Sequence, residues 1–263
     1  MTLLLTSIFS ALIYLLAGVI QASSLSSKKP EPRSLVMMLG SGAWVLHTLS
    51  VYLILHPGNG IQLGLFPVTS LIAWLVSGLV ILSCLKKPLT TLFVGIFPCA
   101  SISVLLAALL PSANLPQQYS GGEIAHILTS ILAYSIFAIA ALQAIVLARQ
   151  DHELRNHHVR GLVRSLPPLQ LMEQLLFEMI WLGFALLSAS LLTGLLFLQD
   201  IFAQHLVHKT GLSFIAWGLF AVLLWGRHQR GWRGMKAIRW ILGGFVFLML
   251  AYFGSKLVLE IMV

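Results

Sequence analysis

The chain has 263 residues, of which 58% are apolar and 9% are charged, and its mean hydropathy is +0.93. Soluble domains carry about 25% charged residues, so these proportions exclude a water-soluble enzyme and a disordered chain. The two cysteines exclude a disulfide scaffold. The composition therefore indicates an integral membrane protein.

Eight stretches are apolar and long enough to cross a bilayer as helices, which takes about 20 residues each. Basic residues follow the first stretch and none precede it, so we predict a retained helix and not a cleaved signal peptide. The connections are too short to fold separately. We predict an all-α, polytopic membrane helical bundle with a single membrane domain, 1–263, made of four helices in 1–110 and a second half in 123–259. The predicted spans are 3–22, 34–54, 63–84, 89–110, 123–148, 172–199, 210–226 and 237–259.

Positive residues alternate along the chain. Of the 16 Lys and Arg residues, all but Lys209 and Lys256 lie next to connections that follow an odd-numbered span. By the positive-inside rule these connections are cytoplasmic, so both termini are predicted on the non-cytoplasmic side. The net charge of +8 then reflects topology and does not indicate binding of nucleic acid.

Further charged residues border the last three predicted spans. Glu173 and Glu178 follow Pro167-Pro168 at the start of the sixth span, and we expect them to interact with the helix dipole as N-terminal capping residues. The arginines at 227, 230, 233 and 239 are expected to meet anionic lipid at the membrane surface.

Five of the nine histidines fall on the predicted outer side: His47, His56, His126, His205 and His208. Two of them, His47 and His126, lie within predicted spans. Ionisable residues inside a membrane are costly and often mark functional sites, although a neutral imidazole can also hydrogen-bond one helix to another. Trp44 shares a helical face with His47 and could line a cofactor or serve as a packing residue.

Neutral imidazole is a ligand for zinc, copper and haem iron. The chain has no compact set of Cys and carboxylate partners of the kind that zinc prefers. It has no C-x-x-C-H sequence, so haem is not expected to be attached covalently. A cleft between helices with axial histidines suits non-covalent haem.

The second half of the chain carries several short blocks in a fixed order. With these blocks the chain resembles the cytochrome c assembly protein family, the CcsA-, CcmC- and HemX-type membrane haem-handling proteins, and especially its short YpjD-type inner membrane members. The resemblance extends from about 125 to 255. The blocks are Ala125-His126-Ile127, Leu166-Pro167-Pro168-Leu169, Met172-Glu173, Thr193-Gly194-Leu195, Trp225-Gly226-Arg227, Gly231-Trp232-Arg233-Gly234 and Ala251-Tyr252-Phe253-Gly254.

Members of this family hold haem on the outer face, between histidines that flank a tryptophan-rich loop. The resemblance implies that His126 is one such histidine and that Lys209 matches a lysine of the loop. As one of two outer basic residues, Lys209 could pair with a haem propionate or extend to the membrane surface as an interfacial lysine. Residues 200–216 contain no tryptophan, and Trp225 stands where longer members carry a histidine. The resemblance therefore implies haem binding, transfer or regulation and not complete haem attachment by this chain alone.

We predict that haem b is held by His126 and His47, because both lie on helices at a similar predicted depth. His205 or His208 is the fallback ligand, and Trp44 and Lys209 are the further predicted haem contacts. The expected partners are the lipid bilayer, haem, and other membrane or cytochrome c maturation proteins.

The predicted location is the bacterial inner (plasma) membrane, as a multi-pass protein. We predict no catalytic residues, since the sequence shows no activated nucleophile, outer carboxylate pair or phosphate loop. A non-catalytic subunit that stabilises a partner protein remains an alternative. A small-solute transporter is a weaker alternative, because no charged residue lies at the centre of a predicted span.

Overall fold

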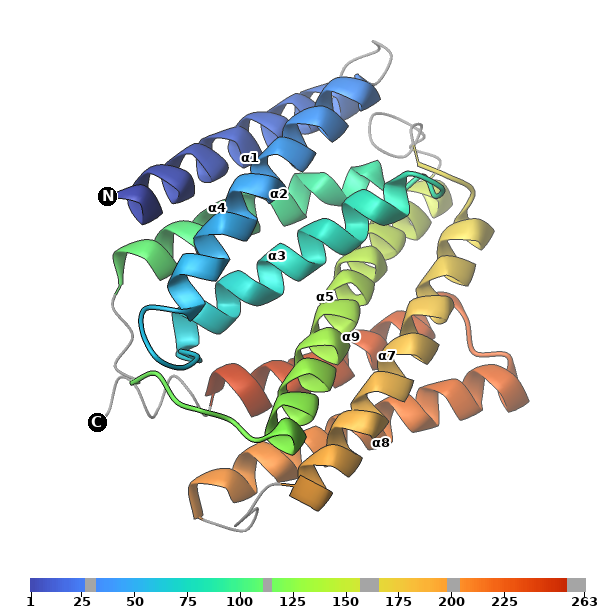
Figure 1. Cartoon of the computed structure of the whole chain (residues 1–263). Helices are drawn as coiled ribbons and strands as arrows, with labels where there is room; N and C mark the ends of the chain where they lie inside the picture. The colour runs from blue at the N-terminus through green and yellow to red at the C-terminus, as the bar shows by residue number, and fades with distance from the viewer. Residues whose placement is uncertain (27–31, 111–114, 157–165, 198–203, 255–263) are drawn as a thin grey trace. The chain divides into compact units, whose positions relative to one another are not determined.

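The computed structural model describes residues 1–26, 32–110, 115–156, 166–197 and 204–254, apart from the side chains of 26 and 204–207. Within these ranges the chain is helical, with turns and a single antiparallel bridge between Ile61 and Gln117. Eight helices are long and apolar enough to cross a membrane, as predicted. They group into two compact units, one with α1–α4 and one with α5–α9 (Figure 1).

The first unit is a four-helix arrangement in which α1 and α3 each pack against both α2 and α4. Close packing depends on a glycine of α2. A Cβ at Gly40 would lie 2.6 Å from the ring of Phe97 on α4, so only hydrogen fits there. Pro98 lies inside α4. Membrane helices tolerate proline because neighbouring groups can bond the backbone carbonyl that proline leaves without its helical partner. The elements are α1 (Thr2–Ser26), α2 (Arg33–Leu55), α3 (Leu65–Cys84), η1 (Thr90–Leu92) and α4 (Phe93–Leu109).

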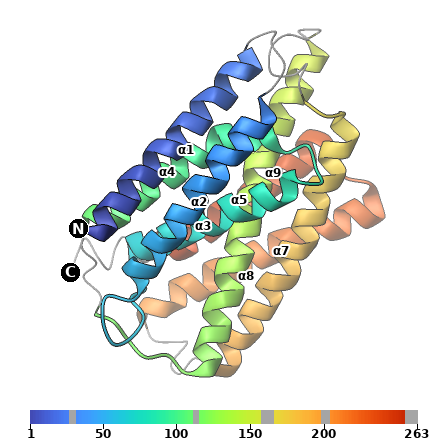
Figure 2. The same ribbon diagram turned by 45° about the horizontal axis from the view of Figure 1, so that its top comes forward.

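In the second unit α5 packs against α7 and α9, and α8 packs against α7 and α9. Figure 2 shows α5 and α7 running side by side. Phe220 of α8 closes against Gly244 of α9, where a Cβ would lie 2.7 Å from the ring. The elements are α5 (Gly121–Arg155), α7 (Leu169–Phe197), α8 (Gln204–Arg230), α9 (Gly234–Met249) and the π-helical turn η2 (Leu250–Gly254).

Helix α5 is longer than the predicted span 123–148. Its 35 residues correspond to about 52 Å, against about 30 Å for the bilayer's hydrocarbon core. It begins with a capping box between Ser120 and Glu123. The extension beyond 148 is charged, and the pairs Arg149–Glu153 (3.5 Å) and Asp151–Arg155 (3.0 Å) support it one turn apart.

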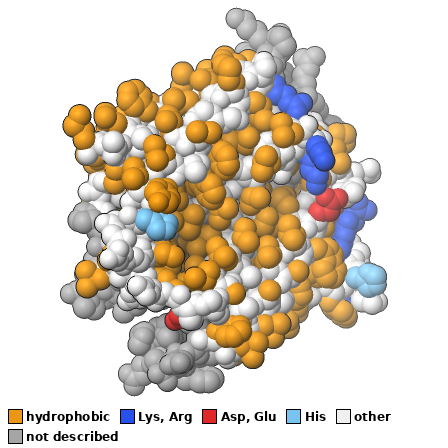
Figure 3. Space-filling model, in the orientation of Figure 1, with side chains coloured by type: hydrophobic (Ala, Val, Ile, Leu, Met, Phe, Trp, Pro, Cys, Tyr) orange, Lys and Arg blue, Asp and Glu red, His pale blue; other side chains and the backbone are white. Residues whose placement is uncertain are grey.

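Large apolar side chains are exposed on helices of both units. Hydrophobic side chains cover most of the face drawn in Figure 3, and charged ones are few. Such a surface would aggregate in water and is stable when lipid covers it. The protein is therefore embedded in the lipid bilayer.

Candidate functional site

His126 lies near the start of α5 in the second unit and is half-buried. Its Nδ1 lies 2.9 Å from the carbonyl oxygen of Ser190 on α7. A carbonyl oxygen only accepts, so Nδ1 carries the proton and donates it. The lone pair of the neutral ring is then on Nε2, whose polar neighbour is the Ser130 hydroxyl at 3.5 Å. The imidazole thus presents an unprotonated nitrogen in a fixed orientation.

Hydroxyl groups hold both partners of this hydrogen bond in place. Ser130 donates to the carbonyl oxygen of His126 at 2.6 Å, and its oxygen lies 2.6 Å from the Ser190 hydroxyl. Thr193 donates to the same Ser190 carbonyl at 3.0 Å. These contacts join α5 to α7 beside the imidazole and limit rotation of the ring.

A positive charge and aromatic rings surround this end of the unit. The ammonium group of Lys209, on α8, is near enough for its charge to act on the His126 imidazole. Its Nζ also lies 5.7 Å from the ring centroid of Tyr252 in η2. Tyr134 on α5 contacts Tyr252 and Phe253, at centroid distances of 6.3 and 5.7 Å. Imidazole, ammonium and aromatic groups suit a flat apolar ligand that carries carboxylates.

His47 lies in the first unit, on α2, and its side chain is completely buried. Its Nε2 is 3.0 Å from the Ser70 hydroxyl on α3, and the ring of Tyr14 on α1 meets it edge-on at 5.8 Å. Its Nδ1 has no hydrogen-bond partner among the described residues. The imidazole on α2 thus contacts residues of α1 and α3. These contacts agree with the packing role that the sequence left open for this histidine beside a role as a ligand.

Trp44 also makes packing contacts in the first unit. It stacks on Trp74 of α3 with ring centroids 5.4 Å apart and an angle of 9° between the planes. Its Nε1 donates to the carbonyl oxygen of Trp74 at 3.0 Å. One face of the indole is therefore covered by protein.

The two fallback histidines lie near the start of α8. The side chain of His208 is exposed, and that of His205 lies outside the described residues. His208 precedes Lys209 directly, so it belongs to the same unit as His126. Across the described residues, no group of three or more His, Cys, Asp and Glu side chains could hold a metal ion.

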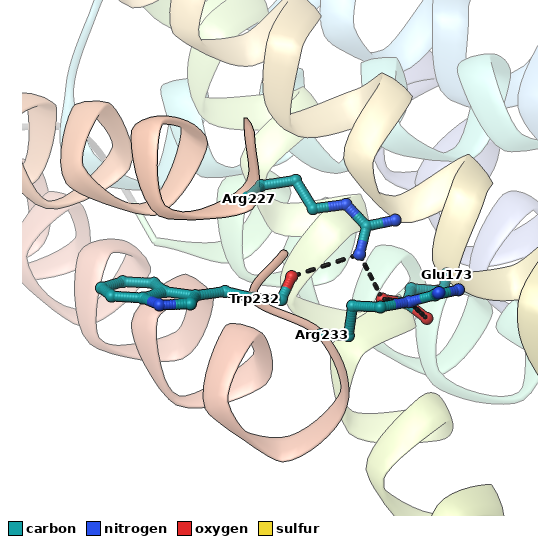
Figure 4. A network of polar contacts seen from close by, with 4 residues as sticks. All are labelled: Glu173, Arg227, Trp232 and Arg233. Carbon is teal, nitrogen blue, oxygen red and sulfur yellow. Dashed lines mark hydrogen bonds and ion pairs between the residues drawn. The ribbon is translucent and has the colours of Figure 1, made fainter. Parts of the chain in front are cut away.

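A second polar site lies at the turn between α8 and α9, and Figure 4 shows its residues. The carboxylate of Glu173 on α7 is buried and accepts from Arg227 Nη1 at 2.9 Å and from Arg233 Nε at 3.3 Å. Arg227 also donates to the carbonyl oxygen of Trp232 at 3.2 Å. Neither Glu173 nor Glu178 lies in the first turn of α7, which begins at Leu169, so the prediction that they cap this helix is wrong. Glu173 forms ion pairs with two arginines that were expected only to meet lipid.

Backbone conformation of the turn brings Arg233 to this position, next to Arg227 at the end of α8. Gly231 and Gly234 adopt φ angles of +61° and +57°, which favour glycine, and they enclose the turn that contains Trp232 and Arg233. The Trp232 ring covers Gly226, where a Cβ would lie 2.4 Å from it. The blocks Met172-Glu173, Gly226-Arg227 and Gly231-Trp232-Arg233-Gly234 thus form one contact. Their charges, one acidic against two basic, were the signal that could have predicted it.

The family model described as "Cytochrome C assembly protein" matches residues 35–263. The chain belongs to the cytochrome c assembly protein family. The match begins well before 125 and includes His47 as well as His126. It therefore extends over a longer part of the chain than the blocks of the second half.

Relatives with similar sequences come from bacteria. The inner membrane protein YpjD of Escherichia coli K12 is 31% identical over 222 residues, which is 83% of this chain and 84% of YpjD. An uncharacterized 28.8 kDa protein from the nifR3-like 5′ region of Azospirillum brasilense is 30% identical over 139 residues, 52% of this chain and 51% of that protein. No solved structure matches the chain significantly. The predicted location in the bacterial inner membrane is confirmed by the similarity to YpjD together with the eight spanning helices.

Proposed function

We propose that this protein binds haem b through Nε2 of His126, for transfer or regulation of haem in a cytochrome c assembly system. The observation that carries the proposal is the hydrogen bond from Nδ1 of His126 to the Ser190 carbonyl oxygen. Histidines that ligate metals usually donate their other ring N–H to a carbonyl or carboxylate, which fixes the tautomer and the ring orientation. Membership of the family supports the same assignment.

Other groups near His126 fit the chemistry of haem. The ammonium of Lys209 would pair with a propionate carboxylate, and Tyr252 beside it offers an aromatic surface for the porphyrin. Bound haem would supply an iron centre that accepts axial nitrogen ligands. The protein residues would hold the ring, neutralise a propionate and keep the imidazole in its metal-binding tautomer.

Two histidines are candidates for the second haem ligand, His47, which is buried, and His208, which is exposed. His47 is the partner predicted from the sequence, and its Nε2 would have to leave Ser70 in order to coordinate iron. His208 is exposed and lies on the same unit as His126. We also propose that the His126 end of α5 faces the non-cytoplasmic side, as the distribution of basic residues indicates.

Absorption spectra of the detergent-purified protein, oxidised and dithionite-reduced, test the proposal. We expect a low-spin b-type spectrum for the wild type and its loss, or a shift to high spin, in His126→Ala. His47→Ala and His208→Ala identify the second ligand by the same change. His56→Ala is the matched control, because His56 is exposed at the end of α2, where its ring stacks on Tyr52 and its Nδ1 bonds the Tyr52 carbonyl oxygen one turn away. Its spectrum should equal that of the wild type.

A wild-type protein that remains colourless after haem is supplied would contradict the proposal. Retention of the full low-spin spectrum in His126→Ala would contradict the assignment of the ligand. In the first case the function of a membrane subunit that stabilises a partner becomes the leading alternative.

A further inference from the structure

A groove of about 580 Å³ opens beside the Glu173 ion pairs, in the second unit. One wall is a single face of α7, since its residues follow one another at intervals of three or four. The other wall is formed by two guanidinium groups from the region where α8 meets α9. The lining residues used below are Gln170, Gln174, Phe177, Trp181, Arg227 and Arg233.

The arginines keep hydrogen-bond donors for a ligand. Arg233 uses Nε for Glu173, and its two Nη groups make no hydrogen bond to a described residue. Its side chain is 58% exposed, against 28% for Arg227. On this wall two guanidinium groups face the one carboxylate of Glu173, an excess of one positive charge, and Glu178 on the opposite wall brings the sum of the four charges to zero. Guanidinium is the protein group that best matches the geometry of a phosphate.

One acidic side chain also lines the groove. Glu178 lies one turn further along α7 than Gln174, and its carboxylate accepts the Gln174 amide at 3.1 Å. It lies on the α7 wall, and the donors of Arg233 come from the turn between α8 and α9. An anion in the groove would therefore be held from the arginine wall.

The groove crosses from polar to apolar surroundings along α7. From Met179 to Phe197 this helix carries no charged residue, so the hydrocarbon of the bilayer begins next to Glu178. Trp181 lies just inside that border and is 56% exposed, as is typical of tryptophans at a membrane interface. Gln170 and Gln174 lie on the polar side. The ligand should thus be charged at one end and apolar at the other.

We propose that this groove binds an anionic phospholipid. Its phosphodiester contacts Arg233 and Arg227, and one acyl chain lies along Phe177 and Trp181. The site is separate from the His126 region and does not rest on the haem proposal. Basic side chains between membrane helices are the usual protein partners of anionic headgroups.

Native mass spectrometry of the full-length, detergent-purified protein tests this proposal. Phosphatidylglycerol and phosphatidylcholine with identical acyl chains are titrated separately. We expect preferential retention of phosphatidylglycerol by the wild type, and an affinity about fivefold lower in Arg233→Gln, the factor typical of one arginine near an anionic headgroup. Arg239→Gln is the matched control, because Arg239 is exposed on α9 and does not line the groove. It should bind as the wild type does.

A second variant separates the lipid site from the ion pairs of Glu173. Trp181→Leu leaves both arginines in place and should lower retention of phosphatidylglycerol through loss of the apolar wall. Equal retention of the two lipids by the wild type would overturn the proposal. An equal effect of Arg239→Gln and Arg233→Gln, no effect of Trp181→Leu, or displacement of phosphatidylglycerol by inorganic phosphate at matched concentration would each overturn it as well.

Discussion

The two histidines within the membrane spans, His47 and His126, have hydrogen-bond partners of different kinds. His126 donates through Nδ1 to a backbone carbonyl, which determines its tautomer. His47 contacts a hydroxyl group that can donate or accept, so its tautomer is not set by Ser70. A histidine with a determined tautomer and an available Nε2 is suited to metal ligation. For this reason the hydrogen bonds favour His126 over His47 as a metal ligand, a distinction that the similar predicted depth of the two residues did not make.

Glu173 of α7 should contribute to stability through its ion pairs with Arg227 and Arg233, which join α7 to the α8–α9 turn. We expect Glu173→Gln to lower the free energy of unfolding by about 2 kcal/mol, because it leaves two guanidinium groups without their carboxylate. The value is below that for a fully buried pair, since Arg227 and Arg233 are partly exposed. Thermal unfolding in detergent, followed by circular dichroism, measures the change.

The control for this variant lies on the same helix. Glu178→Gln should change the melting temperature little, because Glu178 is exposed and the glutamine oxygen can still accept the Gln174 amide one turn away. Equal destabilisation by the two variants would show that the buried ion pairs contribute nothing specific.

At the scale of the helix, close contacts in both units depend on glycines that face aromatic rings. Gly40 faces Phe97, Gly183 faces Phe137 and Gly244 faces Phe220. Small residues let membrane helices approach closely, because lipid provides no hydrophobic force that drives helices together. An apolar stretch in the sequence predicts a helix but does not reveal which glycine meets a ring.

Two glycines of α2 make this argument testable. Gly40→Ala should destabilise the protein by about 1–3 kcal/mol, the usual cost of overpacking, because the new methyl group would meet the Phe97 ring. Gly42→Ala, two residues away on the same helix, meets nothing within 4 Å and should leave the melting temperature unchanged or slightly higher. Identical melting temperatures for both variants would contradict the predicted difference in packing.

At the scale of the whole molecule, the distribution of basic residues predicts the topology. Single cysteines at Asn59 and Lys87, in a background without Cys84 and Cys99, should react differently with a membrane-impermeant maleimide. Asn59→Cys should be labelled in intact spheroplasts, and Lys87→Cys only after permeabilisation, because the loop with Lys86 and Lys87 is predicted to be cytoplasmic. The reverse pattern would invert the predicted sidedness of both termini and of His126.

Much of the architecture was predictable from the chain itself. All eight predicted spans are helical where the structure describes them, and most of their boundaries agree with it within a few residues; the predicted ends 198–199 and 255–259 lie outside the described residues. The largest differences are the extension of α5 to Arg155, where ion pairs one turn apart replace apolar residues, and the start of α8 at Gln204, before the predicted span. Length and hydropathy predict spans well because unpaired backbone groups in lipid are so unfavourable that only helices and closed barrels can cross.

The sequence by itself therefore determined the membrane class, the number of spans and the family, since these depend on composition and on the order of short blocks. Only the tertiary structure decided the partners of the polar residues. Glu173 reaches Arg227 and Arg233 across 54 and 60 residues of sequence, and His126 reaches Ser190 across 64. Hydropathy cannot reveal such contacts, because they depend on which helix faces meet, and packing between apolar helices determines that.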